Sequence, residues 1–145
     1  MKDSLELSVN LNVKAEKLYI DWLDSEEHSK FTGSAARIDP SLNGKFTAWD
    51  GYIFGTNKSL EPFHKIVQTW RTTEFSEKDD DSILEVTFES TGDKTRLVLK
   101  HSNIPEGQGE DYKQGWKEFY LEPMKKHYNK DNEKIKTKSE EQMTA

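Results

Sequence analysis

Residues 112–128 read Tyr-Lys-Gln-Gly-Trp-Lys-Glu-Phe-Tyr-Leu-Glu-Pro-Met-Lys-Lys-His-Tyr, and this stretch decides the fold. Its large apolar and aromatic side chains recur at steps of three and four residues, which is the spacing of one helix face. Glu110 and Asp111, just before it, suit the positive end of a helix dipole. Pro123 lies inside the pattern and predicts a kink or an early end near Leu121. The stretch therefore predicts a C-terminal helix with a broad aromatic face.

The chain between residues 34 and 102 is predicted to form short strands and turns. Leu84, Val86 and Phe88 alternate with polar residues, which gives a strand one apolar and one polar face. Asp50-Gly51 and Thr91-Gly92-Asp93 are hairpin signals. Six such strands follow one another with short connections, and this succession predicts an antiparallel meander.

The first part of the chain adds another strand and two short helices. Apolar residues at every second position from Leu5 to Val13 predict a strand. Helical spacing over residues 15–23 predicts a short amphipathic helix, and Asp24 or Ser25 can cap a second one that ends near Gly33.

An antiparallel sheet with one apolar face needs a cover, and only the C-terminal helix is long and aromatic enough to provide one. We therefore expect an α+β protein in which a curved, antiparallel, seven-stranded sheet grips a long C-terminal helix, with two short helices beside it. This is the arrangement of the helix-grip, START-like (birch-pollen-allergen-like) fold.

One domain is expected over residues 1–128, because a chain of 145 residues has the length of a single domain. Residues 129–145 are almost entirely polar, with Ile135, Met143 and Ala145 as the exceptions. A segment of this composition cannot offset its ordering entropy by burial. We expect a disordered polar tail there.

Composition narrows the classes of partner. The net charge is −6 and 33% of residues are charged, which argues against a nucleic acid or an anionic membrane as partner, because both need a basic face. The absence of cysteine excludes disulfides and thiolate metal sites. The N-terminus lacks the apolar core of a signal peptide, and no apolar run is long enough to span a membrane. We expect a cytoplasmic protein and a monomer.

Several short strings, taken in order, resemble the heat-shock-protein-90 ATPase activator-like family. The strings are Phe31-Thr32-Gly33, residues 44–55, Leu60-Glu61-Pro62, residues 65–71, residues 84–88, Thr95-Arg96-Leu97, residues 101–105 and Gly115-Trp116. Together the similarity covers about residues 5–128. The resemblance implies a non-enzymatic START-like domain with a chaperone-associated or stress-linked role, and a heat-shock-protein-90 type chaperone as partner.

The resemblance also implies a space between sheet and helix that holds a small apolar ligand in many START-like folds. Two interpretations of the side chains facing that space stay open: they fill it as a packed core, or they line a cavity. The candidate cavity residues are Phe46, Phe54, Trp70, Phe88, Leu97, Leu99, His101, Trp116, Phe119 and Tyr120.

The sequence offers little support for catalysis. The four histidines are not paired at metal-ligand spacing, so no metal site is predicted. No nucleophile motif is present, and no cofactor is predicted. We expect an interaction module, with a small-molecule binding protein as the first alternative and a START-like cyclase or aromatase as the second, because such enzymes use cavity residues without a transferable motif.

Overall fold

The computed structural model describes residues 1–129, and its elements follow the predicted order. The strands are β1 (Asp3–Leu11), β2 (Arg37–Ile38), β3 (Lys45–Ala48), β4 (Ile53–Glu61), β5 (Lys65–Thr72), β6 (Ser82–Ser90) and β7 (Thr95–Ile104). The helices are α1 (Ala15–Leu23), α2 (Ser25–Thr32) and α3 (Gly109–Trp116). A π-helical turn, η1 (Lys117–Leu121), continues α3 and leads into an α-helical segment, residues 122–129. Asn129 is thus helical, and the rest of the predicted tail lies outside the described residues.

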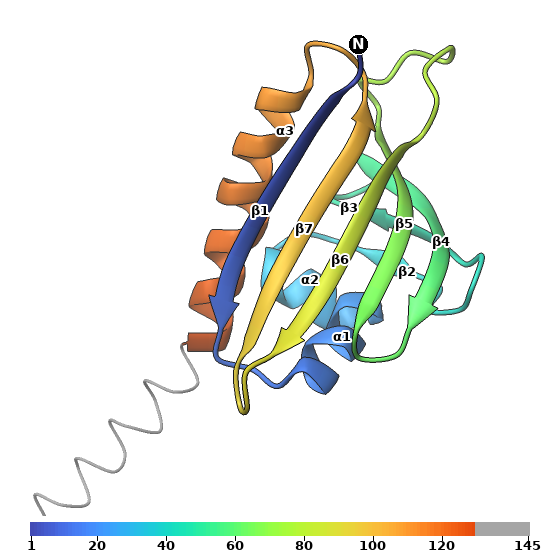
Figure 1. Ribbon diagram of the computed structural model, residues 1–145. Helices are drawn as coiled ribbons and strands as arrows, with labels where there is room; N and C mark the ends of the chain where they lie inside the picture. The colour runs from blue at the N-terminus through green and yellow to red at the C-terminus, as the bar shows by residue number, and fades with distance from the viewer. Residues whose placement is uncertain (130–145) are drawn as a thin grey trace, which may run out of the picture.

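The seven strands form one antiparallel sheet in the order β1-β7-β6-β5-β4-β3-β2. The meander runs from β2 to β7, and the N-terminal strand pairs with β7 at the opposite edge. Figure 1 shows the long helix running along one face of the curved sheet, with α1 and α2 on the same side near its later turns. The predicted helix-grip, START-like architecture is confirmed.

The sequence predicted a kink or an early end near Leu121. The long helix passes through Pro123, so the early end is wrong, and the perturbation takes the form of the π-helical turn just before the proline. Proline has no N–H to donate to the carbonyl four residues back, and its ring clashes with that carbonyl. The backbone widens just before it, since the N–H of Glu122 donates to the carbonyl of Lys117, five residues back. The π-helical turn therefore absorbs the proline, and the helix goes on to its last docking contacts.

The same turn keeps the aromatic face of the helix directed at the sheet. An α-helix advances about 100° per residue, so a face spaced in steps of four drifts by about 160° over four steps. A wide turn holds one extra residue, which rotates the side chains after it back by about 100° and so cancels most of that drift. The side chains that remain buried at this spacing are Tyr112, Trp116, Tyr120, Met124 and Tyr128.

Two polar contacts fix the ends of the helices. The Asp24 side chain accepts a hydrogen bond from the N–H of Glu27 and caps α2, which ends at Gly33 in the left-handed conformation, φ 80°. The Tyr128 hydroxyl donates to the carboxylate of Asp21 on α1 at 2.8 Å. In the part of the chain that the structure describes, no helix is long and apolar enough to cross a membrane.

Candidate functional site

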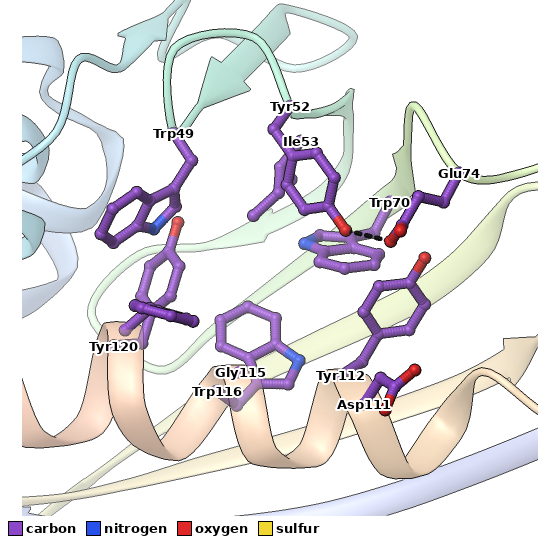
Figure 2. Close-up of a pocket in the computed structure, with 11 residues that line it drawn as sticks. Trp49, Tyr52, Ile53, Trp70, Glu74, Asp111, Tyr112, Gly115, Trp116 and Tyr120 are labelled. Carbon is purple, nitrogen blue, oxygen red and sulfur yellow. Dashed lines mark hydrogen bonds between the residues drawn. The ribbon is translucent and has the colours of Figure 1, made fainter.

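A pocket lies between the long helix and the tip of the β3–β4 hairpin (Figure 2). Its volume is about 380 Å³, toward the lower end of the range of small-molecule sites. The sheet side of its lining consists of Trp49, Tyr52, Ile53, Trp70 and Glu74. The helix side consists of Asp111, Tyr112, Gly115, Trp116, Phe119 and Tyr120.

The base of the pocket is a pair of tryptophans, one from the sheet and one from the helix. Trp70 on β5 and Trp116 on α3 are both buried, and their ring centroids lie 5.8 Å apart. Tyr112, one helical turn before Trp116, packs edge-on against Trp70 at 5.0 Å. Because these rings join the two walls, the base of the pocket is preformed.

The mouth of the pocket is formed by Trp49 and Phe119, whose rings meet edge to face at 5.2 Å. Phe119 belongs to η1 and is 50% exposed. Trp49, at the hairpin tip, has φ 51°, in the left-handed region that bulky residues rarely adopt. Its indole N–H is buried without a hydrogen-bond partner among the described residues. The tip thus combines backbone strain with an unpaired donor at the edge of the pocket.

Hydroxyl groups gather at the end of the pocket near the start of α3 (Figure 2). The Tyr52 hydroxyl donates to the carboxylate of Glu74, and burial together with this bond raises the pKa of Tyr52. The Tyr112 hydroxyl donates to Oε1 of Gln108 at 2.7 Å and lies 2.7 Å from Oγ1 of Thr72, which therefore donates to it. Both tyrosine hydroxyls are thus engaged within the protein.

The described residues that line the pocket include two carboxylates, Glu74 and Asp111, and no Lys, Arg or His. Both carboxylates are exposed. Asp111 makes no ion pair or hydrogen bond with another described residue. The pocket is therefore an aromatic cleft whose formal charge is negative at one end.

His101 lies below the pocket at the centre of the core and is fully buried. Its Nδ1 accepts a hydrogen bond from the indole N–H of Trp116 at 3.1 Å, so Nε2 carries the proton and donates to Oγ of Ser82 at 2.8 Å. The Ser82 hydroxyl donates in turn to the carbonyl of Trp70. Burial lowers the pKa of His101 to about 3, which keeps the ring neutral.

His28 forms a second buried link, between α2 and the long helix. Its Nδ1 donates to the carbonyl of Trp22 at 2.9 Å, and its Nε2 accepts from the Tyr120 hydroxyl at 2.9 Å. Burial lowers the pKa of His28 to about 4, against the opposing effect of the bond to Trp22. Both ring nitrogens of this histidine, like those of His101, are therefore committed to structure.

The arrangement favours binding over chemistry. General acid–base catalysis needs a titratable group with a free proton or lone pair facing the reacting atom. Both buried histidines use their ring nitrogens internally, and the two carboxylates of the pocket are exposed to solvent. Over residues 1–129, no three His, Asp or Glu side chains are grouped so that they could hold a metal ion.

Comparison with known proteins assigns the family. The model of the family described as Activator of Hsp90 ATPase homolog 1-like protein matches residues 12–129. The chain belongs to this family. The activator of 90 kDa heat shock protein ATPase homolog from Dictyostelium discoideum is 36% identical over 96 residues, which are 66% of this chain and 25% of that protein. The human homolog 1 is 30% identical over 113 residues, 78% of this chain and 33% of that protein.

A solved structure of this activator family superposes well. The crystal structure of an HSP90 activator from Plasmodium falciparum has a TM-score of 0.74 and 31% identity, and the match covers 82% of this chain and 91% of that one. The family that the sequence strings indicated is thus confirmed. The chain spans about a quarter to a third of the length of the curated activators it matches.

The ten side chains proposed from the sequence fall into three places. Four of them line the pocket: Trp70, Trp116, Phe119 and Tyr120. Five are buried in the packed core and do not line it: Phe46, Phe88, Leu97, Leu99 and His101.

Phe54 is a correction, because it lies on the outer face of the sheet. It stands opposite Thr47 and Arg71, whereas its neighbour Ile53 points inward and lines the pocket. Successive residues of a strand face opposite sides, so this is an error of one residue in the phase of β4.

Seven lining residues were missed from the sequence. Ile53 is the inward-facing residue of β4 once Phe54 is placed on the outer face. Tyr112 was already predicted to lie on the aromatic face of the helix. Trp49 and Tyr52 flank the hairpin signal Asp50-Gly51, where turn residues are ordinarily taken to face solvent. The other three are Glu74, Asp111 and Gly115. Asp111 was predicted only as a helix start and Gly115 only as part of a family string, and no signal indicated that any of the three lines a pocket.

Proposed function

We propose that this domain is a non-enzymatic, chaperone-associated module that binds a chaperone of the heat-shock-protein-90 type. One observation carries the proposal: the match to the Plasmodium HSP90 activator extends over 91% of that chain at 31% identity. A protein described as an activator of this chaperone thus has nearly the same extent as the domain described here. Binding is proposed for the domain by itself, and stimulation of the ATPase is left for the experiment to decide.

The chemistry of the pocket supports a non-enzymatic role. Its hydroxyl groups are hydrogen-bonded within the protein, and its carboxylates are exposed. A catalytic pair would need an acid and a base with pKa values pushed apart by their environments, at hydrogen-bonding distance from one substrate. The buried histidines are neutral and fully engaged, so they cannot supply the base.

The test is a titration of the purified domain with the purified heat-shock-protein-90 chaperone of the same cell, followed by calorimetry, with serum albumin as the control protein. We expect saturable heat with the chaperone and none with albumin. A coupled ATPase assay on the same mixture then separates a binding module from an activator, because binding without a rate change identifies the former. Absence of saturable binding with and without nucleotide would contradict the proposal.

A second candidate function, binding of a small molecule, is favoured by the pocket itself. A preformed cleft of about 380 Å³ with mainly aromatic walls is typical of sites for small organic ligands. Native mass spectrometry of the domain purified from its own cells tests this function, because a copurified ligand adds a discrete mass. The chaperone titration does not depend on that result.

A further inference from the structure

We propose that the pocket between the β3–β4 hairpin and the long helix binds a small organic cation, such as a quaternary ammonium or a protonated aryl amine. The inference deepens the second candidate function and rests on the pocket being open to small molecules. Two features carry it: aromatic rings on every side of the cleft, and carboxylates at one end without a cation to neutralise them.

The rings supply the attraction for a cation. Aromatic faces carry partial negative charge, and several of them around one cavity attract an ammonium group that has shed its water. Trp70 and Trp116 form the base, and Tyr52 and Tyr112 stand at one end with Trp49 at the other (Figure 2). The ring of Phe119 packs edge to face against Trp49 at the mouth. Three of these six rings, those of Trp70, Tyr112 and Trp116, are buried on β5 and α3, so this part of the cage exists before the ligand arrives.

The carboxylates set the sign of the charge. Glu74 and Asp111 lie at the end of the pocket with Tyr52 and Tyr112 (Figure 2). No basic side chain among residues 1–129 lines the pocket, and Asp111 has no ion-pair or hydrogen-bond partner among them. The nearby Arg71 is engaged elsewhere, with Asp81 at 2.8 Å. The two carboxylates would therefore repel an anion and attract a cation.

The positions of the carboxylates and of the mouth set the orientation of the bound ligand. Its charged group would lie at the Glu74 and Asp111 end, and its apolar part would extend toward Trp49 and Phe119 at the mouth. A lysine side chain from a protein partner would leave much of a 380 Å³ cavity empty, whereas an aryl ammonium has an apolar body that fills it. A small molecule is therefore the better match in size.

The test compares phenyltrimethylammonium with its neutral isostere tert-butylbenzene and with the anion benzenesulfonate. The readout is the set of indole N–H resonances of ¹⁵N-labelled protein. Trp49, Trp70 and Trp116 line the pocket, while Trp22 lies outside it and serves as an internal reference. We expect the cation to shift the three lining signals and to bind about fivefold or more tightly than the isostere, with no binding of the anion. Added salt should lower the affinity for the cation and leave the affinity for the isostere unchanged.

The charge-removing variant is Glu74→Gln with Asp111→Asn, which keeps the shape of both side chains. We expect this variant to bind the cation about fivefold more weakly and the isostere as tightly as the parent does. The effect is modest because both carboxylates are exposed and screened by solvent. The matched control, Glu77→Gln with Glu110→Gln, makes the same change in net charge with exposed residues that do not line the pocket, and it should bind like the parent.

Each other outcome overturns a distinct statement. Equal affinity for cation and isostere overturns the cation proposal while leaving an apolar pocket. No shift of any lining signal overturns both the cation and the small-molecule function. Loss of affinity in the control variant to the same degree as in E74Q/D111N assigns the effect to net charge and overturns the site. Chaperone binding, measured separately, is unaffected by all three outcomes.

Discussion

The indole nitrogen of Trp116 lies 3.1 Å from Nδ1 of His101, so the middle of the C-terminal helix is hydrogen-bonded to the last strand inside the core. The bond is the first in a series that continues through Ser82 to the backbone of Trp70. A helix that covers a sheet only through apolar contacts can slide along it. A buried directional bond at the centre favours one position, because any shift would leave a buried acceptor unpaired.

The first prediction follows from this bond. Trp116→Ala should lower the free energy of unfolding by about 3–5 kcal/mol, because it removes a large buried side chain and leaves a cavity. Trp116→Phe should cost less, about 1–3 kcal/mol, since an aromatic ring still fills most of the site and the loss is dominated by the unpaired Nδ1 of His101. Urea unfolding of both variants measures the two values. Trp116→Ala unfolding at the parent's midpoint would show that the residue does not hold the helix to the sheet.

The second prediction concerns acid. His28 and His101 have pKa values lowered to about 4 and about 3 in the folded protein, against about 6.5 in an unfolded chain. Below pH 6.5 the unfolded chain binds protons that the folded protein does not, so stability falls as pH decreases toward the folded values. Between pH 7 and pH 5 the loss should be about 2 kcal/mol for each histidine.

Urea unfolding at several pH values measures this dependence. His28→Gln removes one of the two groups, so the pH dependence of the variant should be about half that of the parent over the same range. Its stability at pH 7 should also fall, because the link from Trp22 to Tyr120 is lost. An equal pH dependence in parent and variant would assign the acid sensitivity to other groups.

The phase of the strands could be predicted wherever alternation was regular. In β6, Leu84, Val86 and Phe88 are all buried, as their spacing indicated. The phase was lost at β4, because Trp49, Asp50 and Gly51 take positive φ values in succession and turn the chain before the strand begins. Phe54 was predicted to face inward, yet Ile53 has that place.

The long helix shows a second limit of sequence reasoning. Tyr112, Trp116 and Tyr120 indicated its buried face, and Pro123 was correctly singled out as a perturbation. Whether a proline ends a helix or is absorbed by a wide turn depends on what lies beyond it. Here the residues beyond dock onto α1, a tertiary contact between Tyr128 and Asp21 that local spacing does not reveal.

The third prediction tests that contact. Asp21 is 3% exposed and is bound by the Tyr128 hydroxyl at 2.8 Å and by Lys17 at 2.9 Å. Tyr128→Phe removes one donor from a buried carboxylate and should cost about 1.5–3 kcal/mol in urea unfolding. The control Tyr52→Phe removes a hydrogen bond at an exposed carboxylate and should cost less than about 1 kcal/mol. Equal costs would mean that the burial of Asp21 does not decide the effect.

The fourth prediction concerns a close approach inside the sheet. A Cβ atom on Gly55 would lie 1.9 Å from the carbonyl oxygen of Thr69 and 2.8 Å from the ring of Phe46. Gly55→Ala should therefore cost about 3 kcal/mol or more, because the backbone of β5 cannot move away without breaking its pairing. Gly92→Ala is the control, since a Cβ there meets open space and the cost is the strain at φ 83°, about 1–2 kcal/mol. If the two variants unfold alike, the approach at Gly55 is not tight.

The last prediction asks what maintains the π-helical turn. Pro123→Ala restores an N–H that could donate to the carbonyl of Phe119 in a regular α-helix, a gain of about 1 kcal/mol. A regular helix would rotate Met124 and Tyr128 by about 100° away from their buried positions. Exposing these two side chains would cost about 3 kcal/mol or more. Burial outweighs the hydrogen bond, so the turn should persist.

We therefore expect Pro123→Ala to change the free energy of unfolding by less than about 1 kcal/mol and to leave the indole N–H resonance of Trp49, which packs on Phe119, where it is in the parent. Met124→Ala, which removes buried area on the same face, should cost about 2–5 kcal/mol. A displaced Trp49 resonance in Pro123→Ala would show that the proline itself holds Phe119 at the mouth of the pocket. The packing of Met124 and Tyr128 would then not be what decides which side chains of the helix face the sheet.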